Sequence, residues 1–191
     1  MSKNNNIPTF LQNTFRHLKT IHEHRSLVRK FCFQCGLYKQ GLTHDLSKYS
    51  FAELFPSIRY YQGYRSPYTK EKELHGYSLG WLHHKGCNKH HWEYWWDKID
   101  GKWQAIKMPQ NYVVESVCDR IAACKVYQKL QYTQSSALNY YLNSHDEQNL
   151  HLLTANLFER ILRYIAMHGE DAAFKRIKTL IKQKKDLYDA F

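Results

Sequence analysis

The chain has 191 residues, and its 28 lysines and arginines outnumber its 17 aspartates and glutamates, which gives a formal net charge of +11. This length fits one domain with a sizeable core, and the basic balance favours anionic partners or substrates. No apolar run approaches the roughly 20 residues of a membrane span, and residues 1–6 lack the apolar core of a signal peptide. We therefore expect a cytoplasmic protein that has no membrane partner.

Hydrophobic spacing predicts helices along almost the whole chain. Apolar residues recur three and four apart from about residue 10 to residue 35, and Gly36 follows as a stop. Ser50 to Glu53 has the pattern of a capping box, and Pro109 suits the first turn of a later helix. The expected helices after the first cover residues 51–61, 72–84, 109–131, 136–144, 148–168 and 171–190.

Between these helices we expect loops rather than strands. Residues 62–70 and 97–108 are predicted to be loops, and Asn88 is expected to cap a short helix that follows it. The sequence contains no convincing strand pair. We therefore expect an all-α bundle of about six to eight helices, formed by one domain over residues 1–191. Its core covers about residues 10–170, and a basic C-terminal helix covers about residues 171–190.

The five cysteines do not indicate a disulfide framework, because their number is odd and three of them lie in predicted helices. Cys32 and Cys35 have the spacing of a redox pair or of half a zinc site. No second pair follows them and no strand precedes them, so buried thiols in a helix are the favoured interpretation.

The segment from Gly41 to Lys48 contains the most informative pattern, the adjacent pair His44-Asp45 followed by Lys48. An imidazole and a carboxylate at such a pair can bind one divalent cation or bridge two. Lys48 lies about one helical turn beyond Asp45, where its ammonium could meet an anionic substrate. The pattern therefore favours a metal site beside a phosphate contact.

Two further helices supply ligand candidates. His24 lies beside the buried stripe of the first helix, as an inward-facing ligand requires. Glu115 and Asp119 stand four residues apart beside the apolar seam of the helix predicted from Pro109. Because burial of a bare carboxylate is costly, each needs a partner, and a metal ion or Arg120 would serve.

Four histidines fall in one nine-residue window, namely His83, His84, His90 and His91, and aromatic residues lie on both sides of it. Two adjacent pairs, one at a helix end and one at a helix start, can each aim one ring at a shared site. Two surface pairs are the alternative. The sequence leaves open which histidine of each pair faces the site.

The order His, His-Asp, histidine cluster, Asp resembles the HD-domain superfamily of all-helical, metal-dependent phosphohydrolases. This resemblance implies an HD-like helical bundle in which His24, His44, Asp45 and Asp119 ligate a divalent metal. In dinuclear members two extra histidines, much farther apart in sequence than the seven residues found here, bind a second metal. That departure argues against a second metal here, and a mononuclear site fits the sequence equally well.

Several segments also resemble an uncharacterised family of small bacterial proteins with HD-like motifs. The resemblance covers about residues 10–170, and no established activity comes with it. The segments that carry it are residues 24–29, 41–49, 81–86, 88–91, 109–115 and 119–120.

The function expected from these residues is hydrolysis of a phosphate ester, such as a nucleotide or a related small phosphorylated molecule. The cofactor would be a divalent ion of Mn, Fe, Co, Ni, Zn or Mg. We assign catalytic roles to Lys48, Asp45, His84 and His91. Substrate-binding roles are assigned to Lys48, His83, His90, Arg120 and Arg65, the last of which lies close enough after the metal motif to line its mouth.

Two other classes remain open. An HD-type di-iron oxygenase would also use histidine and carboxylate ligands. A non-enzymatic, basic nucleic-acid-binding protein would use the lysines of residues 171–190 and aromatic stacking. Against it, the acids Asp45, Glu115 and Asp119 are poorly suited to a phosphate-binding surface.

Overall fold

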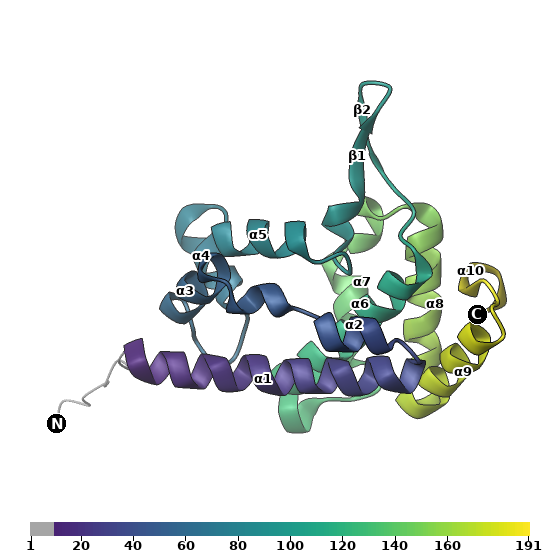
Figure 1. Cartoon of the computed structure of the whole chain (residues 1–191), viewed down its shortest axis with the longest axis horizontal. Coiled ribbons are helices and arrows are strands. Elements are labelled where there is room, and N and C mark those ends of the chain that lie inside the picture. The colour runs from purple at the N-terminus through teal and green to yellow at the C-terminus, as the bar shows by residue number, and fades with distance from the viewer. Residues whose placement is uncertain (1–9) are drawn as a thin grey trace.

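The computed structural model describes residues 10–191, apart from the side chain of residue 147, and shows a helical body from which one hairpin projects (Figure 1). The N-terminal stretch for which no signal peptide was expected lies outside the described residues. The long helices are α1 (Phe10–Cys35), α6 (Gln110–Gln128), α8 (Leu152–His168) and α9 (Glu170–Lys182). The shorter ones are α2 (Tyr38–Thr43), α3 (Phe51–Arg59), α4 (Pro67–His75), α5 (Leu79–Cys87), α7 (Ser136–Ser144) and α10 (Leu187–Ala190). The all-α prediction is confirmed, although the ten helices of this part of the chain exceed the expected six to eight.

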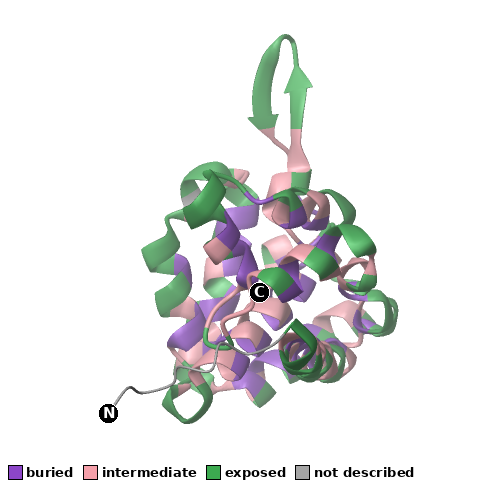
Figure 2. Ribbon diagram, turned by 90° about the vertical axis from the view of Figure 1, so that its left-hand side faces the viewer, coloured by how far each residue is buried: buried purple, intermediate pink, exposed green. Residues whose placement is uncertain are grey.

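Helix α1 has the bounds that the apolar spacing predicts, and it ends where Gly36 adopts a positive φ of 85°. Its inward face packs most extensively against α6. Residues Val28, Phe31 and Cys32 of this face join the main core with apolar side chains of α6, α8 and α9. Figure 2 shows the buried stretches of the helices in purple. The α1–α6 pair is therefore the frame on which the rest of the molecule is built.

The thiols of this frame are buried, as predicted. Cys32, Cys35 and Cys118 are fully buried where α1 meets α6, and none of the cysteines forms a disulfide. Burial and the neighbouring thiols raise the pKa of Cys118 well above its ordinary value, so this thiol stays protonated. These cysteines act as small apolar side chains.

The predicted helix over residues 72–84 is wrong, because two helices occupy this region. Helix α4 begins earlier, with Pro67 in its first turn, and ends at Gly76, which has a φ of 78°. Ser78 then caps α5 by accepting a hydrogen bond from the backbone nitrogen of Trp81. On α5 His84 faces the interior, whereas the His83 side chain is 37% exposed.

Two predicted caps are also wrong. Ser50 makes no side-chain cap bond at the start of α3, and Glu53 is fully buried and bonds to histidines instead. Asn88 does not cap the short 3-10 helix Trp92–Trp95. Its amide donates to the Ser47 hydroxyl at 2.7 Å and to the His84 carbonyl at 2.8 Å, so it ties the end of α5 to the His-Asp motif.

The predicted loop at residues 97–108 contains an antiparallel hairpin of β1 (Trp96–Ile99) and β2 (Lys102–Ala105). Its turn is Asp100-Gly101, with positive φ at both residues, which is the backbone that two-residue hairpins favour. Nearly all residues of the two strands are exposed (Figure 2). The strands therefore lack the buried face whose apolar alternation would have predicted them.

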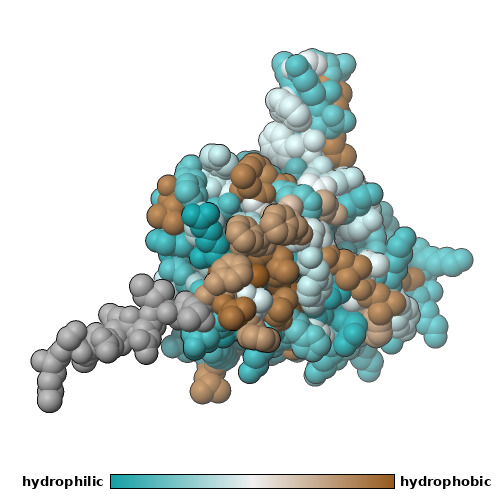
Figure 3. All heavy atoms as spheres, turned by 60° about the vertical axis from the view of Figure 1, so that its left-hand side comes forward, coloured by the Kyte–Doolittle hydropathy of each residue, from teal (hydrophilic) through white to brown (hydrophobic). Residues whose placement is uncertain are grey.

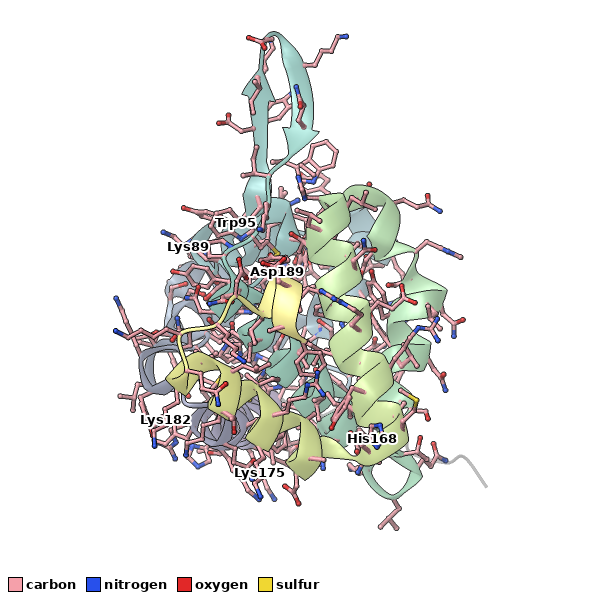
Figure 4. All side chains as sticks on the ribbon, turned by 90° about the vertical axis from the view of Figure 1, so that its right-hand side faces the viewer. Lys89, Trp95, His168, Lys175, Lys182 and Asp189 are labelled. Carbon is pink, nitrogen blue, oxygen red and sulfur yellow. The ribbon has the colours of Figure 1, made fainter. Side chains whose placement is uncertain are left out.

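The C-terminal part and the surface complete the fold. The predicted helix over residues 171–190 is divided into α9 and α10, and Figure 4 shows Lys175 and Lys182 on the outer side of α9. Exposed phenylalanine rings gather where the start of α1 meets α3, with Phe10 and Phe51 on either side of Phe55, and Figure 3 shows apolar side chains on this face. Across residues 10–191, none of the helices has the length and apolar character needed to cross a membrane.

Candidate metal centre

Three elements bring His24, His44, Asp45 and Asp119 together. His24 Nε2 lies 2.9 Å from Asp119 Oδ1, and His44 Nε2 lies 3.4 Å from Asp45 Oδ2 and 3.5 Å from Asp119 Oδ1. Asp45 follows α2 with a left-handed φ of 53°, which aspartate tolerates better than most residues. The ligand atoms of the four side chains lie within 4.8 Å of one another, a spacing that fits one ion, and we name these residues group A.

A second set, group B, consists of Asp45, His84, His90 and His91, and it meets the same spacing criterion. His84 Nε2 and His90 Nε2 lie 3.5 and 3.4 Å from Asp45 Oδ1. The group A atoms lie near the other carboxylate oxygen, Oδ2. Asp45 thus turns one oxygen toward each group. The seven-residue spacing of the histidine cluster does not prevent a second site, because the chain reverses between α5 and Trp92–Trp95.

The polar atoms at the centre face one another, and several of them are ion-pair neighbours without a well-formed hydrogen bond. The Nε2 atoms of His24, His44, His90 and His91, and both oxygens of Asp45, are buried and have no hydrogen bond of good geometry. Buried polar groups are normally paired, because leaving one unsatisfied costs about 1–3 kcal/mol. Because the ligand atoms of each group also lie within 4.8 Å of one another, the arrangement fits coordination of cations.

Two outer carboxylates set the orientation of the rings. Glu115 Oε1 lies 2.9 Å from His44 Nδ1 and 3.2 Å from His90 Nδ1, so one oxygen holds a histidine of each group. Glu53 Oε2 lies 2.7 Å from His84 Nδ1. An ionised carboxylate only accepts, so each Nδ1 donates its proton, and Nε2 is the atom that faces Asp45 and can bind a metal in place of a proton. This is the tautomer that a metal ligand requires.

Charge at the site is consistent with these assignments. Burial alone would raise the pKa of Glu53, but hydrogen bonds from His84 and His83 lower this pKa to about 2. Burial lowers the pKa of His44, but Asp45, Asp119 and Glu115 together raise it to about 10. Without a cation, the carboxylates of the site are therefore partly balanced by the proton on His44 and by the Lys48 ammonium. A divalent ion would replace the His44 proton.

Lys48 lies against the doublet as its position in sequence predicts. Its Nζ is 2.7 Å from Asp45 Oδ2, in the 3-10 helix Leu46–Tyr49, and its side chain is 21% exposed. Burial lowers the pKa of Lys48, but the Asp45 carboxylate raises it above the ordinary value, so the ammonium stays charged. The residue joins the centre to the more open side of the site, where the Asp119 side chain is also 21% exposed.

The remaining candidates lie in different surroundings. His83 is held by Glu53 Oε1 at 2.8 Å and belongs to neither group. Arg65 is bound by both oxygens of Glu73, and Arg120 pairs with Asp146 at 3.2 Å over the Tyr140 ring. His90, which we expected to bind substrate, lies among the ligand candidates beside His84 and His91.

Sequence reasoning missed the role of Glu53 altogether. Its position in a serine-x-x-glutamate pattern predicted a cap, and only the crossing of α3 over α5 places it beside His84. Glu115 was flagged as a buried acid that needs a partner, and the structure supplies His44 and His90. A buried acid on a helix face is therefore the signal that could have indicated an outer carboxylate.

Comparisons with known proteins add a family but no activity. No curated protein matches the chain, and no solved structure matches it. Residues 13–164, which include every residue of groups A and B, match a family described as "Family of unknown function (DUF5662)". The match covers well over half of the sequence, and the chain therefore belongs to the DUF5662 family.

Proposed function

We propose that this protein is a metal-dependent phosphohydrolase that holds two divalent cations, one in group A and one in group B, with Asp45 shared between them. The observation that carries the proposal is the pair of buried groups that share Asp45, in each of which the histidine nitrogens and carboxylate oxygens lie within 4.8 Å of one another. Histidine and carboxylate ligands suit Mn, Fe, Co, Ni and Zn, and the outer carboxylates hold the rings as metal ligands need. The resemblance of the ligand order to HD-domain phosphohydrolases also supports it.

The reaction would be hydrolysis of a phosphate monoester. The oxygen of water forms a bond to phosphorus, the bond from phosphorus to the ester oxygen breaks, and the proton released by water ends on the leaving alcohol. Divalent cations held at such a centre supply Lewis-acid stabilisation of phosphoryl oxygens and an acidified water molecule. Products are an alcohol and inorganic phosphate.

Lys48 is the side chain of this chain best placed to act on the substrate. Its charged ammonium touches Asp45 and its side chain is 21% exposed, so we expect it to hydrogen-bond phosphoryl oxygens on which negative charge develops. Loss of one such donor lowers kcat by about 100- to 1,000-fold in well-studied enzymes. Lys48→Ala should therefore lower kcat by this factor. The variant should keep its metal, because the substitution removes a positive charge that would repel a cation at the neighbouring ligands.

The test begins with protein stripped by a chelator and reloaded with one ion at a time, namely Mn, Fe, Co, Ni, Zn or Mg. Phosphate release is then measured on a panel of nucleotides and sugar phosphates, with metal content determined for each sample. We expect activity that returns with metal, disappears in Asp45→Asn, and survives in Lys175→Ala, a control that removes an exposed lysine of α9. Metal-loaded protein that hydrolyses none of the panel would contradict the proposal.

An HD-type di-iron oxygenase is the second candidate, because histidine-rich groups that share a carboxylate also suit iron. The two functions differ in their requirements. The oxygenase would retain iron and turn over only with oxygen, whereas the phosphohydrolase works in anaerobic buffer. Elemental analysis together with oxygen-uptake measurements separates them.

A further inference from the structure

A basic pocket lies beside the metal centre, between the first half of α1 and the end of α6. Its volume is about 210 Å³, and the residues that matter to its chemistry are Arg16, Lys19, Glu23, Tyr61 and Lys129. None of these residues belongs to group A or group B. We call this cavity the basic pocket.

The basic pocket and group A lie along the same pair of helices. His24 of α1 touches Asp119 of α6 at 2.9 Å. The pocket lies to one side of that contact. Along α1 it lies toward the start of the helix, since Arg16 precedes His24 by eight residues, and along α6 it lies toward the end, since Lys129 directly follows the helix. At 1.5 Å per residue, the stretch of α1 from Arg16 to Thr20 that lines the pocket lies roughly 6–12 Å along the helix from His24.

Polar and aromatic side chains fill the interval between the two. The Tyr61 hydroxyl lies 3.0 Å from Thr20 Oγ1, and its ring packs on that of His17 at 5.3 Å. His17 is buried, and its Nδ1 has no hydrogen-bond partner. Tyr127 lies near enough to Lys48 and Asp119 for their charges to act on it. Thr20 and Tyr61 therefore place two hydroxyl groups at the pocket that can bond to a polar ligand.

The net positive charge of the basic pocket favours binding of an anion. Arg16, Lys19 and Lys129 place three cations around it against the single carboxylate of Glu23, and none of the three forms an ion pair with the side chains that the structure describes. Like charges held together repel one another, and an anion bound among them relieves that repulsion. Lys129 also has a φ of 52° with a ψ of −117°, a backbone that favours glycine. Backbone preference therefore does not explain a lysine at this position.

We propose that the basic pocket binds a second phosphate group of the substrate, so that the substrate is a small molecule with two phosphates separated by roughly 6–12 Å, the distance given by helix rise. One phosphate lies at the metal centre and the other among Arg16, Lys19 and Lys129. The proposal rests on the proposed function for the first phosphate, and the pocket itself acts by binding and positioning.

The test is calorimetric titration of the metal-loaded protein with alkanediol bisphosphates of increasing chain length and with the matching monophosphates. The quantity compared is the ratio of the two dissociation constants. For wild type we expect bisphosphates of one length range to bind at least about tenfold more tightly, equivalent to about 1.4 kcal/mol. Very short diols should show no preference, because they cannot span the interval.

Substitutions in the basic pocket test whether its side chains cause the preference for bisphosphates. Lys129→Gly removes the ammonium and accepts the local backbone, and Arg16→Gln removes the guanidinium, so each should lower the ratio about three- to tenfold with metal content unchanged. Glu23→Gln should raise the ratio. Lys175→Ala removes the same charge from α9 and should leave the ratio as it is.

The outcomes distinguish this proposal from the one on which it rests. A ratio near one at every length, or an equal loss in Lys175→Ala, overturns the basic pocket as a phosphate subsite. Tighter binding of a single-stranded oligonucleotide that depends on Arg16 and Lys129 also overturns it, in favour of a nucleic-acid surface. If bisphosphates bind selectively but no phosphate is released from any of them, the hydrolase fails and the subsite stands.

Discussion

Replacement of Glu115 by leucine should weaken metal binding at both groups, because one carboxylate oxygen holds both His44 and His90. The two distances are 2.9 and 3.2 Å, and each bond fixes the tautomer of one ligand candidate. Loss of such an outer carboxylate typically lowers metal affinity by about 10- to 100-fold, or about 1.4–2.7 kcal/mol. We therefore expect this loss at each of two sites. Glu115→Gln should lose less, because its Oε1 can still accept from both rings.

Glu53 supplies the matched comparison. It orients His84 of group B, and its other oxygen holds His83, which belongs to neither group. Glu53→Leu should therefore weaken one site and spare the other. The assay is competition for Zn²⁺ or Co²⁺ against a chromogenic chelator, which resolves two dissociation constants. Equal effects of both variants on both sites, or no effect of Glu115→Leu, would refute the reasoning.

Three further predictions concern the same region. Asp45→Asn keeps a side chain that tolerates the left-handed backbone, and it should lose bound metal and lower the melting temperature, as chelation of wild type should; unchanged melting in both experiments would contradict a metal-dependent fold. Because the pKa of His44 is about 10 without metal, metal binding at pH 7 should release at least one proton, and the affinity for the metal should rise with pH. Calorimetric titrations in buffers of different ionisation enthalpy measure this release, and finding none would contradict the prediction. Burial, and to a smaller extent the nearby charge of Lys48, lowers the pKa of His17 from 6.5 to about 4. Between these pH values the unfolded chain therefore binds more protons than the folded one, and up to about 3 kcal/mol of folding stability should be lost as the pH falls from 6.5 to 4. Urea unfolding of His17→Gln should lack that part of the loss.

The elements that could be predicted from sequence are those with a buried stripe and a clear stop. Helix α1 has apolar residues three and four apart before Gly36, and its bounds follow from that pattern. The hairpin has a turn signal in Asp100-Gly101, but its strands bury neither face, so no alternation indicates them. The break between α4 and α5 depends on Gly76, an isolated glycine that a helix can also tolerate.

The candidate site was partly predictable for a similar reason. His24, His44, Asp45 and Asp119 stand beside apolar stripes or in a recognisable order, and the structure brings them together. The pairing of His84 with His90 depends on a chain reversal after Asn88, and the orientation of His84 depends on Glu53 from another helix. Contacts between elements far apart in sequence leave no periodic signal in either one. The structure was needed to show that Asp45 faces two groups.

The most direct test of the central claim is anomalous diffraction from crystals grown with Mn²⁺ or Fe²⁺ and recorded at the metal edge. The account predicts two peaks, one on the Oδ2 side of Asp45 near His24 and Asp119, and one on the Oδ1 side near His84 and His90. Nitrogen and oxygen ligands should lie about 2.0–2.3 Å from the ions. Crystals of active, metal-supplemented protein that show no anomalous peak beside Asp45 would contradict the account.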